Sequence, residues 1–282
     1  MNRVLHLIFN ILLLCVSSKT LGGFVPENDL FIFDAPQQAN LDETKFNELL
    51  TEVQTAYQPV IRKLGGRLRI VGIWDSPEVN AHATRDKVYW YVRVLGGLAR
   101  RPEISPDAMS LIVCHEVGHH IAGWPFYPGR WAAAEGQADY FSTQACAKVL
   151  WREKLSENLL FRSIVSEKVR RTCDGLHKNA SEQDLCYRML WASKAVGEFL
   201  AFFEGTNVDF ETADTSTVDY TLYTHPSAQC RFDTLVAGAL CMKAFPQDSI
   251  PSGAASAKAS SCSRSEGYDV GYRPRCWFGP SF

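Results

Sequence analysis

The chain has 282 residues, of which 46% are hydrophobic, and its formal net charge is −2. That length and composition suffice for a sizeable buried core in one or two domains. The near-neutral charge excludes nucleic acid and an acidic membrane surface as the main partners. The sequence also contains no internal repeat and no long run of like charges.

The first residues are typical of a secretory signal peptide. A positively charged start at Arg3 precedes a mostly apolar run over residues 4–16, which is shorter than the roughly 20 residues that span a bilayer. Cleavage fits at residues 16–18 or 20–23. We predict a signal peptide over residues 1–22 and a secreted or periplasmic protein with no transmembrane segment after its removal. The alternatives are an uncleaved anchor and lipid attachment at Cys15, which the large side chain of Leu14 disfavours.

The cysteine count indicates disulfides. Removal of Cys15 with the signal peptide leaves eight of the nine cysteines, an even number in an exported chain. Cys230 and Cys241 cannot pair if one helix contains both, because they would lie about 16 Å apart. Cys114 and Cys146 occur in apolar helical runs, where they are either disulfide-bonded or buried thiols. The remaining connectivity is open.

The periodicity of apolar residues predicts a first helix and then three strands. The helix begins near Leu41, is bent or interrupted at Pro59 and ends at Gly65-Gly66. Alternating apolar and polar residues predict the strands, which cover residues 67–74, 79–83 and 87–94. We expect these strands to form a small antiparallel sheet.

Helices dominate the rest of the sequence. Ser105-Pro106 is a typical helix start, with a capping hydroxyl before a proline in the first turn. The segment after Pro246 is rich in Ser, Ala, Gly and Pro, which indicates an irregular tail held by cysteines. The fold class is therefore α+β, with a mostly helical body. The predicted helices cover residues 105–123, 131–151, 157–171, 182–203 and 226–244.

Two histidines form the first part of a predicted metal site. His115 and His119 are four residues apart on the predicted helix, so both rings lie on one face with Cβ atoms about 6 Å apart. Glu116 follows the first histidine, where its carboxylate can reach a metal-bound water. This is the HExxH arrangement of zinc peptidases. A solvated His/Glu helix face is the alternative.

A second pair of residues supports the metal site. Glu135 and Asp139 are four residues apart on the next predicted helix. Glu135 can supply the third ligand of a catalytic zinc, and Asp139 can accept the second ring N–H of a ligand histidine. Two surface carboxylates are the alternative, but the alanine and aromatic neighbours disfavour it. We predict one Zn²⁺ per chain.

Three separated stretches resemble the HtpX-like zinc metalloendopeptidases, a family of the gluzincin group that includes the CAAX-prenyl endopeptidases. They are Val79-Asn80-Ala81, the HEVGHH segment with the later Glu135-to-Asp139 segment, and Thr224-His225-Pro226 with Arg231. The resemblance implies a zincin-like fold, with a gluzincin-type domain over residues 23–245 and a Cys-containing tail over residues 246–282 packed on it.

The resemblance also implies a role for each matched residue. His115, His119 and Glu135 would bind zinc, Glu116 would be the catalytic base, and Asp139 would support a ligand histidine. His225 would stabilise the oxyanion or act as an extra ligand, and Arg231 would brace that region by an ion pair. The sheet edge at Asn80 and Ala81 would bind the substrate backbone as an added strand. From the sequence alone, without the resemblance, His225 is favoured to be an ordinary histidine at a helix start.

The expected function is that of an exported zinc endopeptidase that hydrolyses proteins or peptides through a zinc-activated water. Two departures from the family leave alternatives open: the stretch between His119 and Glu135 is short, and no family counterpart matches the Cys-rich tail. One alternative is a non-hydrolytic zinc-binding or chaperone-like module. Another is a latent protease whose N-terminal stretch or tail covers the site. The sequence predicts no oligomeric state.

Overall fold

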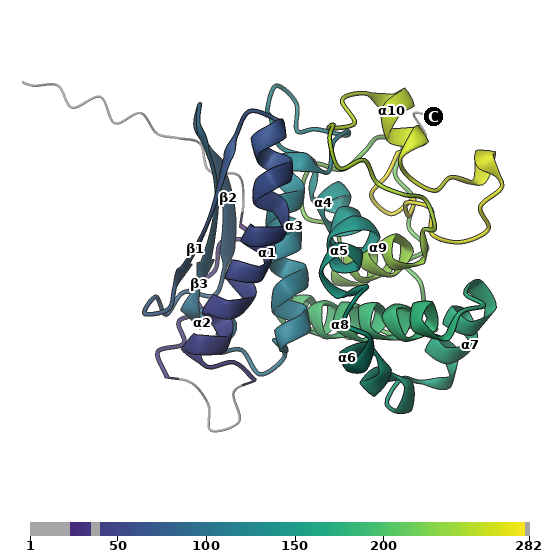
Figure 1. Ribbon diagram of the computed structural model, residues 1–282, viewed down its shortest axis with the longest axis horizontal. Helices are drawn as coiled ribbons and strands as arrows, with labels where there is room; N and C mark the ends of the chain where they lie inside the picture. The colour runs from purple at the N-terminus through teal and green to yellow at the C-terminus, as the bar shows by residue number, and fades with distance from the viewer. Residues whose placement is uncertain (1–22, 35–39, 280–282) are drawn as a thin grey trace, which may run out of the picture.

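A computed structural model of the protein describes residues 23–34 and 40–279. The predicted signal peptide, including Cys15, lies outside the described residues. A small sheet lies on one side of the molecule, followed by helices α1 (Glu43–Lys63) and α3 (Pro106–Ile121), and most other helices lie beyond α3 (Figure 1). The predicted α+β class with a mostly helical body is confirmed.

The described part of the chain contains one three-stranded sheet, and it is mixed. The strands are β1 (Arg67–Ile73), β2 (Ala81–Arg85) and β3 (Tyr89–Leu95), in the order β1-β3-β2. β2 and β3 form an antiparallel hairpin, whereas β1 pairs with β3 in parallel. The prediction of a purely antiparallel sheet was therefore wrong, because alternation identifies a strand but does not give the direction of a non-consecutive neighbour.

Helix α1 packs on the sheet through an apolar stripe that includes Phe46 and Leu50. Its start is fixed by Asp42, whose side chain accepts the N–H of Lys45. The predicted interruption at Pro59 does not occur, since the helix continues to Lys63. The proline ring lies on the exposed side of the helix, where water can bond the backbone carbonyl that loses its partner.

Helix α3 is the centre of the fold. It begins as predicted, with Ser105 capping the N–H of Ala108 at 3.1 Å. Its residues from Asp107 to Ile121 are all buried, because the sheet, α1 and the helices of the body pack around it. The Asp107 carboxylate accepts two hydrogen bonds from the Arg188 guanidinium, at 2.8 and 2.9 Å. This bidentate pair holds the first turn of α3 against the helix that carries Arg188.

The predicted helix over residues 131–151 begins four residues later than expected. It consists of α4 (Glu135–Phe141), the π-helical segment η1 (Ser142–Ala147) and α5 (Lys148–Trp151), which follow each other directly. The alanines before α4 favour helix on propensity alone. Their backbone instead pairs with another segment, because Ala133 N–H donates to the carbonyl of His119 at 3.0 Å.

The remaining helices match the predictions in part. The helix expected over residues 157–171 is divided, because Ser166 caps a new helix at Val169 N–H. The two later helices occur within a few residues of their predicted bounds. These elements are α6 (Leu155–Leu159), η2 (Leu160–Ser163), α7 (Glu167–Leu176), α8 (Ala180–Glu204) and α9 (Ala228–Leu240), with the short α2 (Gly96–Ala99), α10 (Ala254–Ala259) and η3 (Arg264–Glu266) elsewhere.

Among the described residues, eight cysteines form four disulfides. Cys114–Cys146 joins α3 to η1, so these two residues are not free thiols. Cys230 and Cys241 each pair with the tail rather than with each other. Such a set is typical of oxidising compartments and is compatible with an extracellular or periplasmic protein. The pairs are Cys114–Cys146, Cys173–Cys186, Cys230–Cys276 and Cys241–Cys262.

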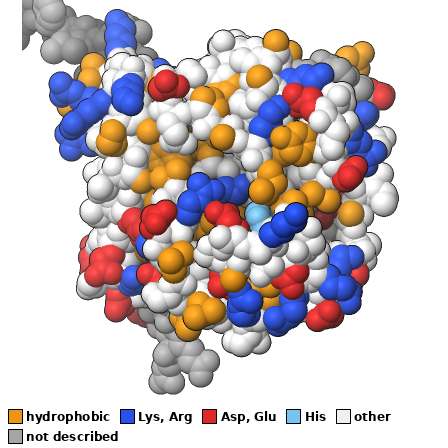
Figure 2. Space-filling view, turned by 45° about the vertical axis from the view of Figure 1, so that its right-hand side comes forward, with side chains coloured by type: hydrophobic (Ala, Val, Ile, Leu, Met, Phe, Trp, Pro, Cys, Tyr) orange, Lys and Arg blue, Asp and Glu red, His pale blue; other side chains and the backbone are white. Residues whose placement is uncertain are grey.

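In the part of the chain that the structure describes, none of the helices has both the length and the apolar character needed to cross a bilayer. The face shown in Figure 2 carries acidic and basic side chains interspersed, in keeping with the net charge of −2.

The disulfide between α3 and η1 gives a test of the fold. Replacing both Cys114 and Cys146 by Ser should lower the free energy of unfolding by about 3–4 kcal/mol, because the bridge closes a loop of 32 residues in the unfolded chain. Urea unfolding followed by circular dichroism measures this loss. The same comparison under a reductant that opens every disulfide is the control. If the two proteins differed by the same amount under reducing conditions, the loss of stability would come from packing and not from the disulfide.

Candidate metal centre

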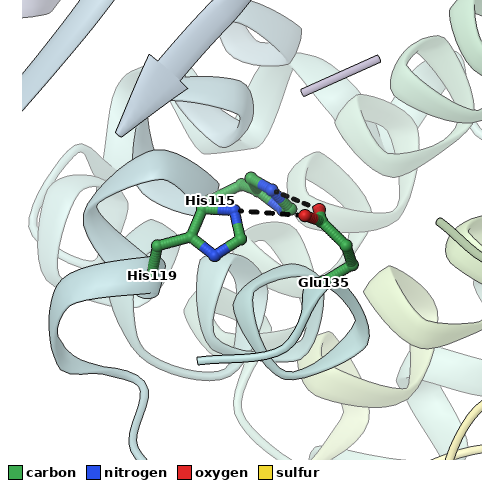
Figure 3. A group of neighbouring side chains, drawn as sticks. All are labelled: His115, His119 and Glu135. Atoms are coloured by element: carbon green, nitrogen blue, oxygen red, sulfur yellow. Dashed lines mark ion pairs between the residues drawn. The ribbon is translucent and has the colours of Figure 1, made fainter. Parts of the chain in front are cut away.

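Three side chains from α3 and α4 converge on one point. His115 and His119 extend from α3 toward the carboxylate of Glu135 at the start of α4 (Figure 3). His115 Nε2 lies 3.2 Å from one Glu135 oxygen, and His119 Nε2 lies 3.7 Å from the other. The three ligand atoms lie within 4.8 Å of one another, and all three residues are fully buried. The sequence prediction that these residues come together is therefore confirmed.

The two histidine rings are oriented by hydrogen bonds on their other nitrogen. His115 Nδ1 donates to the Asp139 carboxylate at 2.7 Å, and His119 Nδ1 donates to the carbonyl of Ala133 at 2.9 Å. Because these oxygens can only accept, each ring has its Nδ1 protonated and its Nε2 directed at Glu135. The late start of α4 contributes directly, since it leaves the Ala133 carbonyl free for His119.

The donor set fits a divalent cation. His115 Nε2, His119 Nε2 and one Glu135 oxygen are buried without a hydrogen-bond partner, which is costly unless an ion satisfies them. Two imidazoles and one carboxylate are a known ligand set for catalytic zinc. In the metal-free protein, burial opposes a charge on His115, but Asp139 and Glu135 raise its pKa to about 9.

Glu116 lies beside the ligands with neither carboxylate oxygen hydrogen-bonded. Burial raises the pKa of Glu116 to about 8, while the charge of His115 acts in the opposite direction. A cation among the ligands would favour the ionised form. Burial lowers the pKa of His119 to about 4, so this ring is neutral as a metal ligand must be.

Asp139 connects the ligand helix to α9. Its carboxylate accepts two hydrogen bonds from Arg231, from Nε at 2.8 Å and from Nη2 at 2.9 Å, besides the one from His115. Burial alone would raise the pKa of Asp139, but the charges of Arg231 and His115 lower it to about 2. Arg231 therefore forms an ion pair with Asp139, the residue that accepts the hydrogen bond of His115.

His225 and Tyr127 complete the surroundings of Glu135. His225 Nε2 lies 3.5 Å from one Glu135 oxygen, and the Tyr127 hydroxyl donates to the other at 2.6 Å. No sequence pattern indicates the contact of Tyr127 with Glu135, because a residue in an irregular loop has no spacing rule that links it to a ligand. His120, next to His119, is not part of this cluster, and its ring stacks on Trp131 with ring centroids 4.7 Å apart.

The sheet edge predicted to bind substrate is covered by the chain itself. Asn80 and Ala81 lie at the start of the edge strand β2. Phe24 N–H donates to the Ala81 carbonyl at 2.9 Å, and the Asn80 amide bonds the backbone of Val25. In this structure the polar groups at this position are therefore occupied by the chain's own backbone, and binding of a substrate there stays a prediction.

A second group of potential ligand atoms does not form a metal site. Asp214 lies close to the sulfurs of Cys230 and Cys276. Both cysteines belong to one disulfide, and disulfide sulfurs are not the thiolates that bind zinc. Among the residues that the structure describes, the His115–His119–Glu135 cluster is therefore the candidate metal centre.

Comparison with known proteins gives no match. Neither a family model, nor a curated protein, nor a solved structure matches the chain. Arguments about function therefore rest on the residues of the site.

The support of His115 can be tested by metal binding. Asp139→Asn should weaken zinc affinity about 10- to 100-fold, because the amide no longer orients and polarises the ring as a carboxylate does. Competition with a chromogenic chelator measures the affinity. The control is His177→Gln, which changes a buried histidine outside the cluster and should leave the affinity unaltered. Full affinity in Asp139→Asn would contradict the assigned support.

The burial of Glu116 gives a pH-dependent prediction for the metal-free protein. Its pKa is raised from 4.5 to about 8 in the folded state, so ionisation opposes folding increasingly as pH rises through this window. The free energy of unfolding of Glu116→Gln minus that of the wild type should therefore be larger at pH 7 than at pH 4, by up to about 3 kcal/mol. Urea unfolding with chelator at both pH values measures it. The exposed Glu211→Gln is the control, and a gain that did not change with pH would contradict the assignment.

Proposed function

We propose that this protein is an exported zinc-dependent endopeptidase, similar in type to the HtpX-like enzymes. The observation that carries the proposal is the convergence of His115, His119 and Glu135 beside the unpaired Glu116 carboxylate. Three ligands alone would suit a structural metal equally well. A buried acid with both oxygens free, adjacent to those ligands, is the feature that hydrolysis requires and a structural site does not.

His115, His119 and Glu135 would hold the zinc ion. When bound, zinc would polarise the scissile carbonyl and lower the pKa of a water molecule to about 7. Glu116 would accept the proton of the attacking water and deliver it to the leaving amine. Its burial keeps its affinity for a proton high, which suits a group that must take the proton and give it up within one turnover.

Two donors near Glu135 are suited to stabilise a developing oxyanion. His225 Nε2 donates to a backbone carbonyl at 2.9 Å while it lies 3.5 Å from Glu135, so it already binds a peptide oxygen near the ligands. The Tyr127 hydroxyl is within the same surroundings. Asn80 and Ala81 would bind the substrate backbone, since this edge carries the polar groups that an added segment needs.

The catalytic role of Glu116 gives a direct test. Glu116→Gln should lose activity on casein-type or unfolded-protein substrates by about 10²- to 10⁴-fold, because the amide cannot take a proton. The zinc content of the variant should stay at one ion per chain, which separates loss of the base from loss of the metal. Chelation of the wild-type protein should also abolish hydrolysis. Equal rates for both proteins would contradict the mechanism.

A second candidate function is a non-hydrolytic zinc-binding module. Complete burial of the three ligand side chains favours it, because a catalytic site must admit a substrate. This candidate would be favoured over the peptidase if the protein bound one zinc ion per chain but hydrolysed no member of a peptide library. The same result would be needed after the residues that cover the β2 edge, Phe24 and Val25, had been detached.

A further inference from the structure

Residues Gly23, Phe24 and Val25, here named the 23–25 segment, lie against the start of β2. Phe24 N–H donates to the Ala81 carbonyl at 2.9 Å. The Asn80 side chain accepts the N–H of Val25 at 3.2 Å and donates to its carbonyl at 3.1 Å. The segment is thus held through its backbone groups by one bond to the Ala81 carbonyl and two to the Asn80 side chain, without forming a strand of its own.

Two of the three carbonyls of the segment are bound by His225 and Arg231 of the candidate site. The Gly23 carbonyl accepts from His225 Nε2 at 2.9 Å, and the Phe24 carbonyl accepts from Arg231 Nη1 at 2.6 Å. His225 is also 3.5 Å from Glu135, and Arg231 is paired with Asp139. The peptide bond between Gly23 and Phe24 therefore runs next to the metal ligands, with its carbonyl on the His225 side.

The side chain of Phe24 is enclosed by residues of the same site. Its ring packs edge-on against His115 with centroids 4.9 Å apart, lies parallel to Phe199 at 6.3 Å and is covered by the Arg231 guanidinium at 4.4 Å. Only 1% of the residue is exposed. We name the space bounded by His115, Phe199 and Arg231 the Phe24 site; it suits a large aromatic or apolar side chain.

The segment also fits closely at its first residue. A Cβ on Gly23 would lie 2.3 Å from the Asn80 side-chain oxygen, so a larger residue would displace the Asn80 amide. All three residues are buried, as are the ligands beneath them. A substrate cannot reach the ligands by this edge while the segment stays in place.

We infer that the 23–25 segment occupies the candidate site as a peptide ligand, and that the Phe24 site selects a large aromatic residue directly after the cleaved bond of a substrate. This inference rests on the proposed function. The segment and the substrate then compete for the same side-chain donors, for the Ala81 carbonyl and for the Phe24 site, so the intact chain is self-inhibited until the segment is displaced.

A binding experiment tests the inference without hydrolysis. A recognition sequence for a site-specific protease is inserted after the exposed Glu27 in the full chain, with Glu116→Gln to prevent turnover and with zinc bound. After cutting and removal of the segment, a labelled acetyl-Gly-Phe-Val-Pro-Glu peptide should bind at least about tenfold more tightly than the same peptide with Ala for Phe. The uncut chain should bind neither. Equal affinities, equal binding to the uncut chain, or unfolding once the segment leaves would overturn the inference.

A matched pair of variants tests the same point in the uncut chain. Phe24→Ala should let the labelled peptide bind, whereas Phe33→Ala, the same change at a residue that is 72% exposed, should not. Binding to both variants, or to neither while circular dichroism shows Phe24→Ala to be folded, would count against self-inhibition. If Phe24→Ala does not fold, the cut chain decides the question.

Hydrolysis by the cut chain that retains Glu116, after removal of the 23–25 segment, provides a separate measurement. Between two otherwise identical fluorogenic peptides, the one with Phe directly after the cleaved bond should have a kcat/KM at least about tenfold higher than the one with Asp. Equal values would overturn the assigned selectivity. Absence of any hydrolysis would contradict the proposed function instead, and the peptide-binding result would then still decide whether the 23–25 segment is an exchangeable ligand.

Discussion

The buried carboxylate of Asp139 is the interaction on which the site depends. A carboxylate without solvent is unstable unless it is paired and hydrogen-bonded, and Asp139 meets this condition through His115 and Arg231. Arg231 in turn binds the Phe24 carbonyl. One charge thus links α3, α4, α9 and the 23–25 segment, so the position of the ligand ring is coupled to the position of α9 and to whatever peptide lies on the β2 edge.

The sequence predicted those parts of the site that follow from spacing along one helix. His115 with His119 and Glu135 with Asp139 each have a separation of four residues, and helical geometry puts such pairs on one face. The two pairs were assigned to one site because a catalytic zinc needs a third protein ligand besides the two histidines. Arg231 and His225 were reached only through resemblance, because no local rule connects α9 to α3.

Other features could not be predicted because they depend on contacts between distant segments. The covering of the β2 edge joins Phe24 to Ala81, and neither residue has a pattern that indicates the other. The same holds for Tyr127 and Glu135. In the sheet, alternation identified each strand within a few residues, but the parallel pairing of β1 with β3 is set by how the chain crosses between them. Helix propensity placed the start of α4 too early, since the bonds between Ala133 and His119 outweigh it.

The disulfide beside the ligand helix has a consequence for the order in which this protein matures. Cys114 immediately precedes the ligand His115, and its sulfur is bonded to Cys146. In a reducing compartment, the eight cysteines would be thiols, and their thiolates are strong zinc ligands that would compete with the histidines for the ion. Oxidation removes this competition at the same time as it ties α3 to η1. If the site binds zinc as proposed, an ion that arrives after disulfide formation meets the His115–His119–Glu135 cluster without competing thiolates, whereas an ion that arrives earlier would meet an unfolded chain that carries them.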